Sequence, residues 1–124
     1  MMLRNELYEL LSVEGSEGNF EARVRLLPQS VVFAVHFPGM PVAPGACLVQ
    51  MACELVSEVC GAGLDACGAS DIRFLHTVLP GESDELSFRL EGTVPADGPA
   101  VWTVQVFSAD TLCARMKLSL QKTA

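Results

Sequence analysis

The feature that most constrains the fold is an apolar run over residues 44–60. Pro44 suits the first position of a helix, because its missing N–H has no intrahelical partner there, and Gly61 is a typical stop. Apolar side chains surround most of the circumference of such a helix, so it has to be buried rather than lie on a surface. The sequence therefore predicts a central helix with the rest of the chain folded around it.

Segments in which apolar and polar residues alternate predict strands on both sides of this helix. They cover residues 20–27, 71–79, 85–94, 101–107 and 112–120, and the alternation in the last one places Cys113 on the outer face. The periodicity of residues 3–11 predicts a short amphipathic helix, and the Gly-rich residues 61–68 predict a loop. A curved antiparallel sheet wrapped around one buried helix, ending in a meander of at least four strands, satisfies these patterns. We therefore expect one α+β domain over residues 1–124.

Composition and charge exclude several classes of protein. The formal net charge is −7 and the eight Lys and Arg residues are scattered, which argues against a nucleic-acid partner. No stretch approaches the roughly 18 apolar residues of a membrane span. The N-terminus lacks the apolar core of a secretory signal, so we expect a cytoplasmic protein without a membrane partner.

The cysteines are odd in number and lack the spacing of metal ligands, so we expect reduced thiols and no metal site. They are Cys47, Cys53, Cys60, Cys67 and Cys113. The first three fall in the apolar helix, where a free cysteine packs as a small hydrophobic residue.

A Pro- and Gly-rich segment leads into the central helix and carries the candidate chemistry. It reads HFPGMPVAPGA from His36 to Ala46. A histidine titrates near neutral pH and can remove a proton from carbon. A helix N-terminus offers free N–H groups to an oxygen that becomes negatively charged. Gly45, without a Cβ atom, lets a substrate approach that backbone closely.

This segment resembles the signature of the 3-hydroxyacyl-acyl-carrier-protein dehydratases, a family with the hot-dog fold. The family pattern is His-Phe-Pro-Gly, a variable residue, Pro, two residues, Pro-Gly, four residues and then a carboxylate. Every element but the last is present here at matching spacing, and residues 73–75 and 78–82 are similar to the family's third-strand pattern. The resemblance covers most of the chain.

The resemblance implies a function as well as a fold. It implies dehydration of a 3-hydroxyacyl chain carried on the phosphopantetheine of an acyl carrier protein or of CoA, in fatty-acid or related biosynthesis. It also implies a homodimer or higher assembly with the acyl tunnel at the subunit boundary, and no metal or tightly bound cofactor. The site residues would be His36 as the catalytic base, with Phe37, Pro38, Gly39, Gly45 and Ala46 around the substrate.

The main departure from the family lies at Gln50, where the family carries Glu or Asp, while Glu54 follows one helical turn later. An amide can form hydrogen bonds but cannot act as a titrating acid. Three interpretations stay open: Glu54 has become the acid; the protein binds acyl thioesters as the silent partner of an active subunit; or it catalyses hydrolysis or isomerisation. Alternatively, Glu54 is an ion-paired or hydrogen-bonded group at a subunit interface.

Two further predictions concern other parts of the chain. An acidic carrier protein would need a local basic surface, for which Arg73, Arg115 and Lys117 are the candidates. His76 falls in a predicted strand without a carboxylate or cysteine at useful spacing, so we expect it to be structural.

Overall fold

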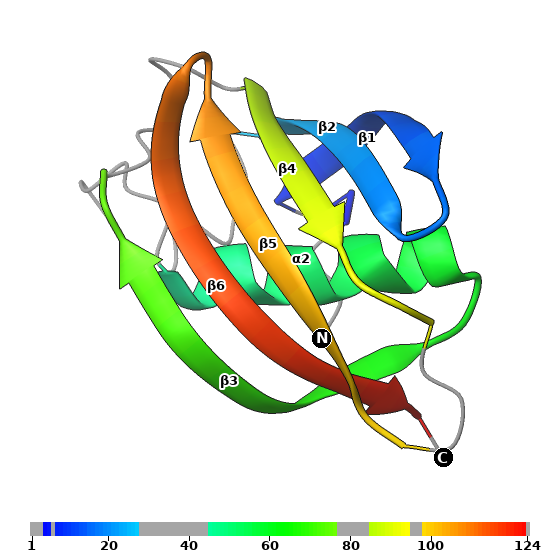
Figure 1. Cartoon of the computed structure of the whole chain (residues 1–124). Helices are drawn as coiled ribbons and strands as arrows, with labels where there is room; N and C mark the ends of the chain where they lie inside the picture. The colour runs from blue at the N-terminus through cyan, green and yellow to red at the C-terminus, as the bar shows by residue number, and fades with distance from the viewer. Residues whose placement is uncertain (1–3, 6, 28–44, 77–84, 95–97, 124) are drawn as a thin grey trace.

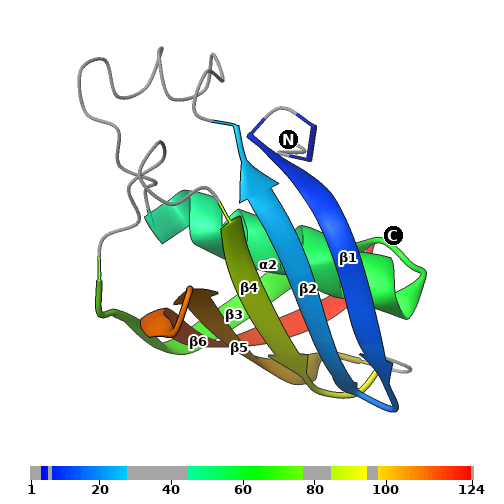
Figure 2. The same ribbon diagram turned by 90° about the horizontal axis from the view of Figure 1, so that it is seen from above.

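The computed structural model describes residues 4–5, 7–27, 45–76, 85–94 and 98–123, which contain six strands and one helix. These elements are β1 (Tyr8–Ser16), β2 (Asn19–Leu26), α2 (Gly45–Cys60), β3 (Leu64–Phe74), β4 (Glu85–Glu91), β5 (Ala100–Ser108) and β6 (Thr111–Lys122). All strands join one sheet in the order β1-β2-β4-β5-β6-β3, and every neighbouring pair is antiparallel. The sheet curves around α2, which lies on its concave side (Figures 1 and 2). The expected α+β architecture is confirmed.

Helix α2 supplies the centre of the core. Its buried face consists of Leu48, Met51, Ala52, Leu55 and Val56, none of which is more than 3% exposed. The sheet contributes the other half, and its largest fully buried side chains include Trp102, Tyr8, Phe88 and Met116. Full burial of one such side chain stabilises a fold by about 1.5–3 kcal/mol, so this contact between helix and sheet dominates the stability.

The predicted helix over residues 3–11 is wrong. Residues Tyr8–Ser16 form β1, which pairs with β2 through a tight turn at Glu17 and Gly18, both with positive φ. Gly18 is required there, because a Cβ atom would lie 2.2 Å from the carbonyl oxygen of Gly92. Hydrogen bonding to a neighbouring strand therefore outweighs the helical spacing of the leucines, which is a weak local preference.

The third strand also differs from the prediction. It begins at Leu64, inside the segment expected to be a loop, and ends at Phe74. Pairing with β6 decides this outcome, because Leu64 lies opposite Lys122 and Phe74 opposite Ala114. Strand β3 therefore lies at the far edge of the sheet, and only β4, β5 and β6 form a meander.

Cys113 is 2% exposed, contrary to the outward position predicted from alternation. The register of β5 and β6 shifts here: Val106 pairs with Ala114, whereas Phe107 pairs with Leu112. Cys113 is thus the extra residue of a β-bulge, which places two consecutive residues on the inner side.

Gly92 allows Trp102 to pack, and its replacement tests this packing. A Cβ atom at Gly92 would lie 2.4 Å from Cδ2 of Trp102, whose indole N–H donates to the Thr93 carbonyl at 2.8 Å. Because the ring is fully buried and cannot move freely, we expect Gly92→Ala to lower the free energy of unfolding by about 1–3 kcal/mol. Urea denaturation measures the change.

The matched control for this substitution is Gly98→Ala, where a Cβ atom meets no atom of the described residues within 4 Å. That variant should unfold within about 0.5 kcal/mol of the parent. Equal stability of the two alanine variants would contradict the proposed role of Gly92.

Candidate functional site

The structure places half of the predicted site on one helix. Four of the eight predicted residues lie on α2: Gly45, which is the first residue of the helix, Ala46, Gln50 and Glu54. The other predicted residues lie outside the part of the chain that the structure describes; they are His36, Phe37, Pro38 and Gly39.

Gly45 lies against an aromatic ring that the sequence analysis missed. A Cβ atom at Gly45 would lie 2.5 Å from Cζ of Phe74, the last residue of β3. The glycine thus lets the edge strand approach the N-terminus of α2, and Phe74 is still 53% exposed. The sequence signal for this contact was a phenylalanine at the end of a strand of mostly small and polar residues. Access of a thioester to Gly45 stays a prediction.

Gln50 and Glu54 lie on one half-buried face of α2 and contact each other directly. The Gln50 amide donates from Nε2 to Oε2 of Glu54 at 2.9 Å. This is the usual pairing of side chains four residues apart on a helix. The orientation of the Gln50 amide is therefore linked to the carboxylate beside it.

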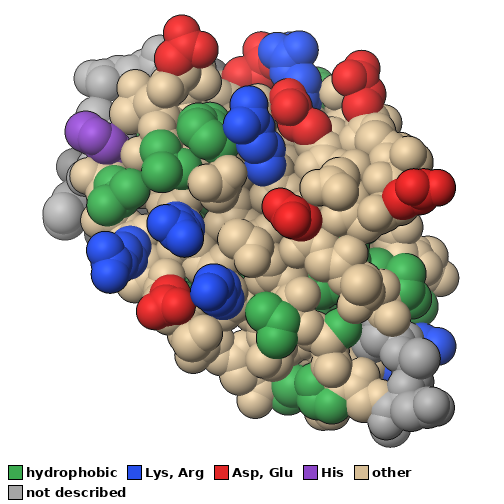
Figure 3. All heavy atoms as spheres, in the orientation of Figure 1, with side chains coloured by type: hydrophobic (Ala, Val, Ile, Leu, Met, Phe, Trp, Pro, Cys, Tyr) green, Lys and Arg blue, Asp and Glu red, His purple; other side chains and the backbone are tan. Residues whose placement is uncertain are grey.

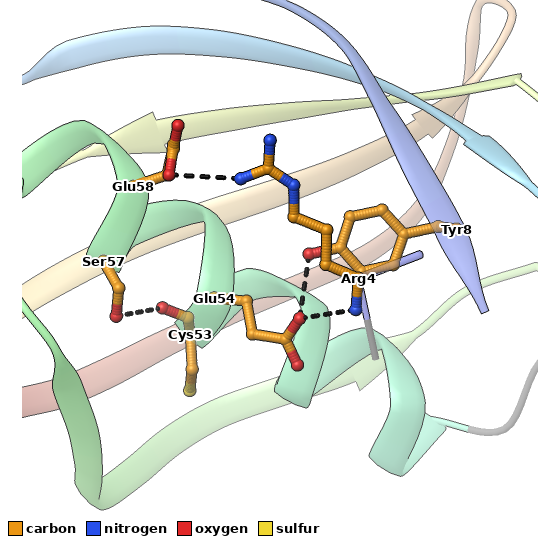
Figure 4. A network of polar contacts seen from close by, with 6 residues as sticks. All are labelled: Arg4, Tyr8, Cys53, Glu54, Ser57 and Glu58. Atoms are coloured by element: carbon orange, nitrogen blue, oxygen red, sulfur yellow. Dashed lines mark hydrogen bonds and ion pairs between the residues drawn. The ribbon is translucent and has the colours of Figure 1, made fainter. Parts of the chain in front are cut away.

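Glu54 also holds the N-terminal segment against α2. Its Oε1 accepts from the Tyr8 hydroxyl at 3.0 Å and from the Arg4 backbone N–H at 2.9 Å, and the Arg4 side chain forms an ion pair with Glu58 at 3.2 Å (Figure 4). A proton on Glu54 would compete with these donors for an oxygen that already accepts. The geometry thus favours an anchoring role for Glu54 over the role of general acid.

Tyr8 is the second residue that the sequence analysis missed. Its side chain is fully buried, and burial together with the Glu54 carboxylate raises the pKa of the phenol far above its usual value. The phenol therefore stays protonated and donates to Glu54. Its position in a segment expected to be helical concealed this role.

A pocket of about 530 Å³ lies beside this network, between α2, the start of β3 and the N-terminal segment. Its lining includes Gln50, Cys53, Glu54 and Ser57 from α2. Burial, followed by the nearby Asp65 and Glu54, raises the pKa of the Cys53 thiol to about 11. Cys53 is therefore a neutral thiol at physiological pH, which disfavours it as a nucleophile.

His76 lies apart from this network, exposed beyond the end of β3. Its backbone N–H donates to the Cys113 carbonyl. Among the described residues, no group of His, Cys, Asp and Glu is arranged to hold a metal ion. In the described part of the chain, no helix has both the length and the apolar character that crossing a membrane requires.

Comparisons with known proteins give a family and a fold. A family model described as ApeI-like, ApeI dehydratase, matches residues 12–116. No curated protein matches the chain.

Three solved structures illustrate the similarity of fold. The dehydratase heterocomplex ApeI:P from Xenorhabdus doucetiae matches with a TM-score of 0.71 and 16% identity, over 92% of this chain and 97% of that one. An uncharacterized protein from Erwinia carotovora subsp. atroseptica matches with a TM-score of 0.67 and 20% identity, over 94% and 97%. A hypothetical thioesterase from Streptococcus pneumoniae, solved with coenzyme A, matches with a TM-score of 0.66 and 15% identity, over 94% and 86%. At these identities the matches show the hot-dog fold alone.

The buried phenol generates a prediction at alkaline pH. Because its pKa is raised in the folded state, Tyr8 contributes stability that is present below the usual tyrosine pKa of about 10 and is lost as the pH rises above it. Tyr8 is the chain's only tyrosine, so ultraviolet absorbance of the phenolate reports this one group. We expect phenolate absorbance to appear only when the protein unfolds.

The control is Tyr8→Phe, which removes one donor to Glu54 and should lower the free energy of unfolding at neutral pH by about 1–3 kcal/mol. This variant should lose less stability than the parent above pH 10. Titration of the native protein near pH 10, as in the denatured chain, would contradict the buried contact.

Proposed function

The chain belongs to the ApeI-like dehydratase family, and on this basis we propose that it binds 3-hydroxyacyl thioesters and dehydrates them slowly to enoyl thioesters. The observation that carries the proposal is the start of α2 at Gly45, directly after the segment that contains His36. In the proposed site, the free N–H groups of this buried helix and His36, nine residues before Gly45 in the sequence, act on the same substrate.

The two parts of this arrangement supply different steps of the elimination. His36 removes the proton from C2 of the acyl chain, and the hydroxyl on C3 leaves as water with a proton taken from solvent, to which His36 later returns its own. The carbonyl oxygen of the thioester gains negative charge as C2 loses its proton. The first turn of α2 stabilises that charge, because its N–H groups lack intrahelical partners and lie at the positive end of the helix dipole.

Gln50 explains why the reaction is slow. At the position where the family pattern has an acid, its amide can hold the leaving hydroxyl but cannot give it a titrating proton. Loss of a general acid typically costs roughly 10²–10⁴ in rate. Glu54 does not replace it, since its oxygens accept from Gln50, Tyr8 and Arg4.

A second candidate function is that of a partner subunit in a dehydratase complex. Two observations favour it: the missing carboxylate at Gln50, and the similarity of fold to a chain of the ApeI:P heterocomplex. In this case the protein would bind the acyl chain while another subunit supplies the acid. A third candidate, hydrolysis of the thioester, has support from the fold of the hypothetical thioesterase, but the segment from His36 to Gly39 argues against it.

The substrate carrier and the compartment belong to the same proposal. We expect the acyl group on the phosphopantetheine of an acyl carrier protein or on CoA, in fatty-acid or related biosynthesis; the S. pneumoniae structure contains coenzyme A. All five cysteines are free thiols, which supports a reducing compartment such as the cytoplasm.

The exposed edge of the sheet supports a homodimer. Ten of the eleven residues of β3 are exposed, and among the described strands β3 pairs with β6 alone. Exposed apolar side chains lie on or just beyond this strand, namely Ile72, Phe74 and Leu75. A long exposed edge with apolar side chains is a surface that folded proteins cover.

We therefore predict that light scattering at micromolar concentration reports a species of at least twice the 13.3 kDa chain mass. Ile72→Glu, which puts a charge on this edge, should shift the equilibrium toward monomer. The control Val101→Glu changes an equally apolar but more exposed residue of β5 and should leave the assembly intact. A monomeric parent protein would rule the dimer out.

The dehydratase proposal is tested by restoring the acid. Gln50→Glu places a second carboxylate beside Glu54, and repulsion between them raises the pKa of one, which can then donate a proton. We expect dehydration of a short 3-hydroxyacyl thioester to rise by about tenfold or more. Formation of the enoyl product and release of free thiol are followed together, which separates dehydration from hydrolysis.

Two variants complete this experiment. His36→Ala should abolish dehydration in both backgrounds. Glu54→Gln should lower the free energy of unfolding, because Glu54 anchors the N-terminal segment. Its effect on the dehydration rate of the folded protein should be small by comparison. If the parent, Gln50→Glu and His36→Ala give the same rate, the protein is no dehydratase, and the partner-subunit function takes its place.

A further inference from the structure

The outer face of the sheet brings two arginines together on neighbouring strands. Arg73 of β3 lies directly opposite Arg115 of β6 in the strand register, and both side chains are exposed. Like charges in this position destabilise a pair of strands. The two guanidinium groups of Arg73 and Arg115 therefore repel each other in the folded chain.

The other arginines of the chain form ion pairs with carboxylates. The eight Lys and Arg residues all lie in the described part of the chain, and five of them form ion pairs. These pairs are Arg4–Glu58, Arg23–Glu85, Arg25–Glu9, Arg89–Glu21 and Lys117–Asp71. Among the described residues, Arg73 and Arg115 are therefore the two arginines that form no ion pair with a carboxylate, in a chain whose formal net charge is −7.

Charges separate along one row of residues that crosses the sheet. From β1 to β3 the registers place Glu14, Glu21, Arg89, Gln105, Arg115 and Arg73 next to one another. The acidic residues lie on β1 and β2, and the basic end lies on β6 and β3. Lys117, two residues from Arg115 on the same face, extends the basic end, and Asp71 is its partner at 3.7 Å. Lys and Arg side chains gather over β3 and β6 in the space-filling view (Figure 3).

This basic end lies close to the candidate site. Arg73 is followed by Phe74, whose ring lies against the position of a Cβ atom at Gly45. Neighbouring residues of a strand point to opposite faces, so Arg73 faces outward where Phe74 faces the N-terminus of α2. A partner bound to the outer face of β3 and β6 would be one strand away from that N-terminus.

We propose that Arg73, Arg115 and Lys117 form the docking surface for the acidic face of the protein that delivers the acyl thioester, a proposal that rests on the function proposed above. Carboxylates of the partner would neutralise the repulsion between the two arginines. A flexible phosphopantetheine arm would then carry the acyl group to the N-terminus of α2 at Gly45. The acidic residues on β1 and β2 would repel the same partner, which restricts docking to one end of the sheet.

The experiment compares two double variants with the same net charge. Arg73→Gln/Arg115→Gln removes the unpaired arginines, and Arg23→Gln/Arg25→Gln removes two ion-paired arginines from β2. Binding of a labelled bacterial acyl carrier protein, loaded with a 3-hydroxybutyryl group, is measured by fluorescence anisotropy at low and high salt. We expect the first variant to bind on the order of tenfold more weakly than the parent at low salt, with less dependence on salt, and the second to bind like the parent.

Kinetics with small substrates separate docking from chemistry. With the same acyl group on N-acetylcysteamine, which carries no protein and no phosphate, both double variants should match the parent. If carrier binding depends on Arg73 and Arg115 but no thioester is dehydrated, the docking surface stands and the dehydratase proposal fails. Equal binding of the carrier by all three proteins, or equal weakening in both double variants, overturns the docking surface.

Two further measurements address phosphate as the competing ligand. Arg73→Lys/Arg115→Lys keeps both charges and should retain carrier binding, whereas loss of binding would indicate a paired guanidinium site for phosphate. Free CoA should not displace the carrier protein. Displacement by CoA at micromolar concentration would assign the arginines to a nucleotide phosphate and overturn the proposal of a protein partner.

Discussion

The burial of α2 against the concave face of the sheet is the interaction on which the rest of the structure depends. The helix is apolar along one broad face, and the sheet curves so that five of its strands, together with the edge strand β3, surround that face. A flat sheet would cover only part of the helix. The apolar run in the sequence therefore requires a curved sheet. The bulge at Cys113 is one local source of that curvature.

Because one helix serves the core, the same helix has to carry the polar site on its remaining face. Gln50 and Glu54 lie on that face, and each is held by contacts that also support the fold. The exchange of an acid for an amide at Gln50 would therefore alter chemistry without disturbing the core. Replacement of Glu54 would disturb the attachment of β1 as well, so the two positions are not equivalent.

The parts predicted correctly from the sequence are those in which local pattern and burial agree. The alternation of Leu86, Phe88 and Leu90 in β4 and the apolar run of α2 are confirmed in this way. The errors arose where distant partners decide the structure: β1 is a strand because of β2, and β3 extends to Leu64 because of β6. Tyr8 and Phe74 were missed for the same reason, since their contacts with Glu54 and Gly45 join residues 46 and 29 positions apart. The roles of Gln50 and Glu54 were open alternatives, because spacing alone cannot show which side chain a carboxylate contacts.

The contacts of Glu54 also bear on how the chain reaches its final state. Its carboxylate accepts from Tyr8 and from the Arg4 backbone, across sequence separations of 46 and 50 residues. Contacts over such distances form late, because a long loop has to close before they add stability. During synthesis, β1 and β2 emerge before α2 exists, so the Tyr8 phenol has no acceptor at that stage. The hairpin of β1 and β2 can form early, but the pocket beside Glu54 is complete only after the helix folds back on it. Maturation of the pocket is thus a late step of folding.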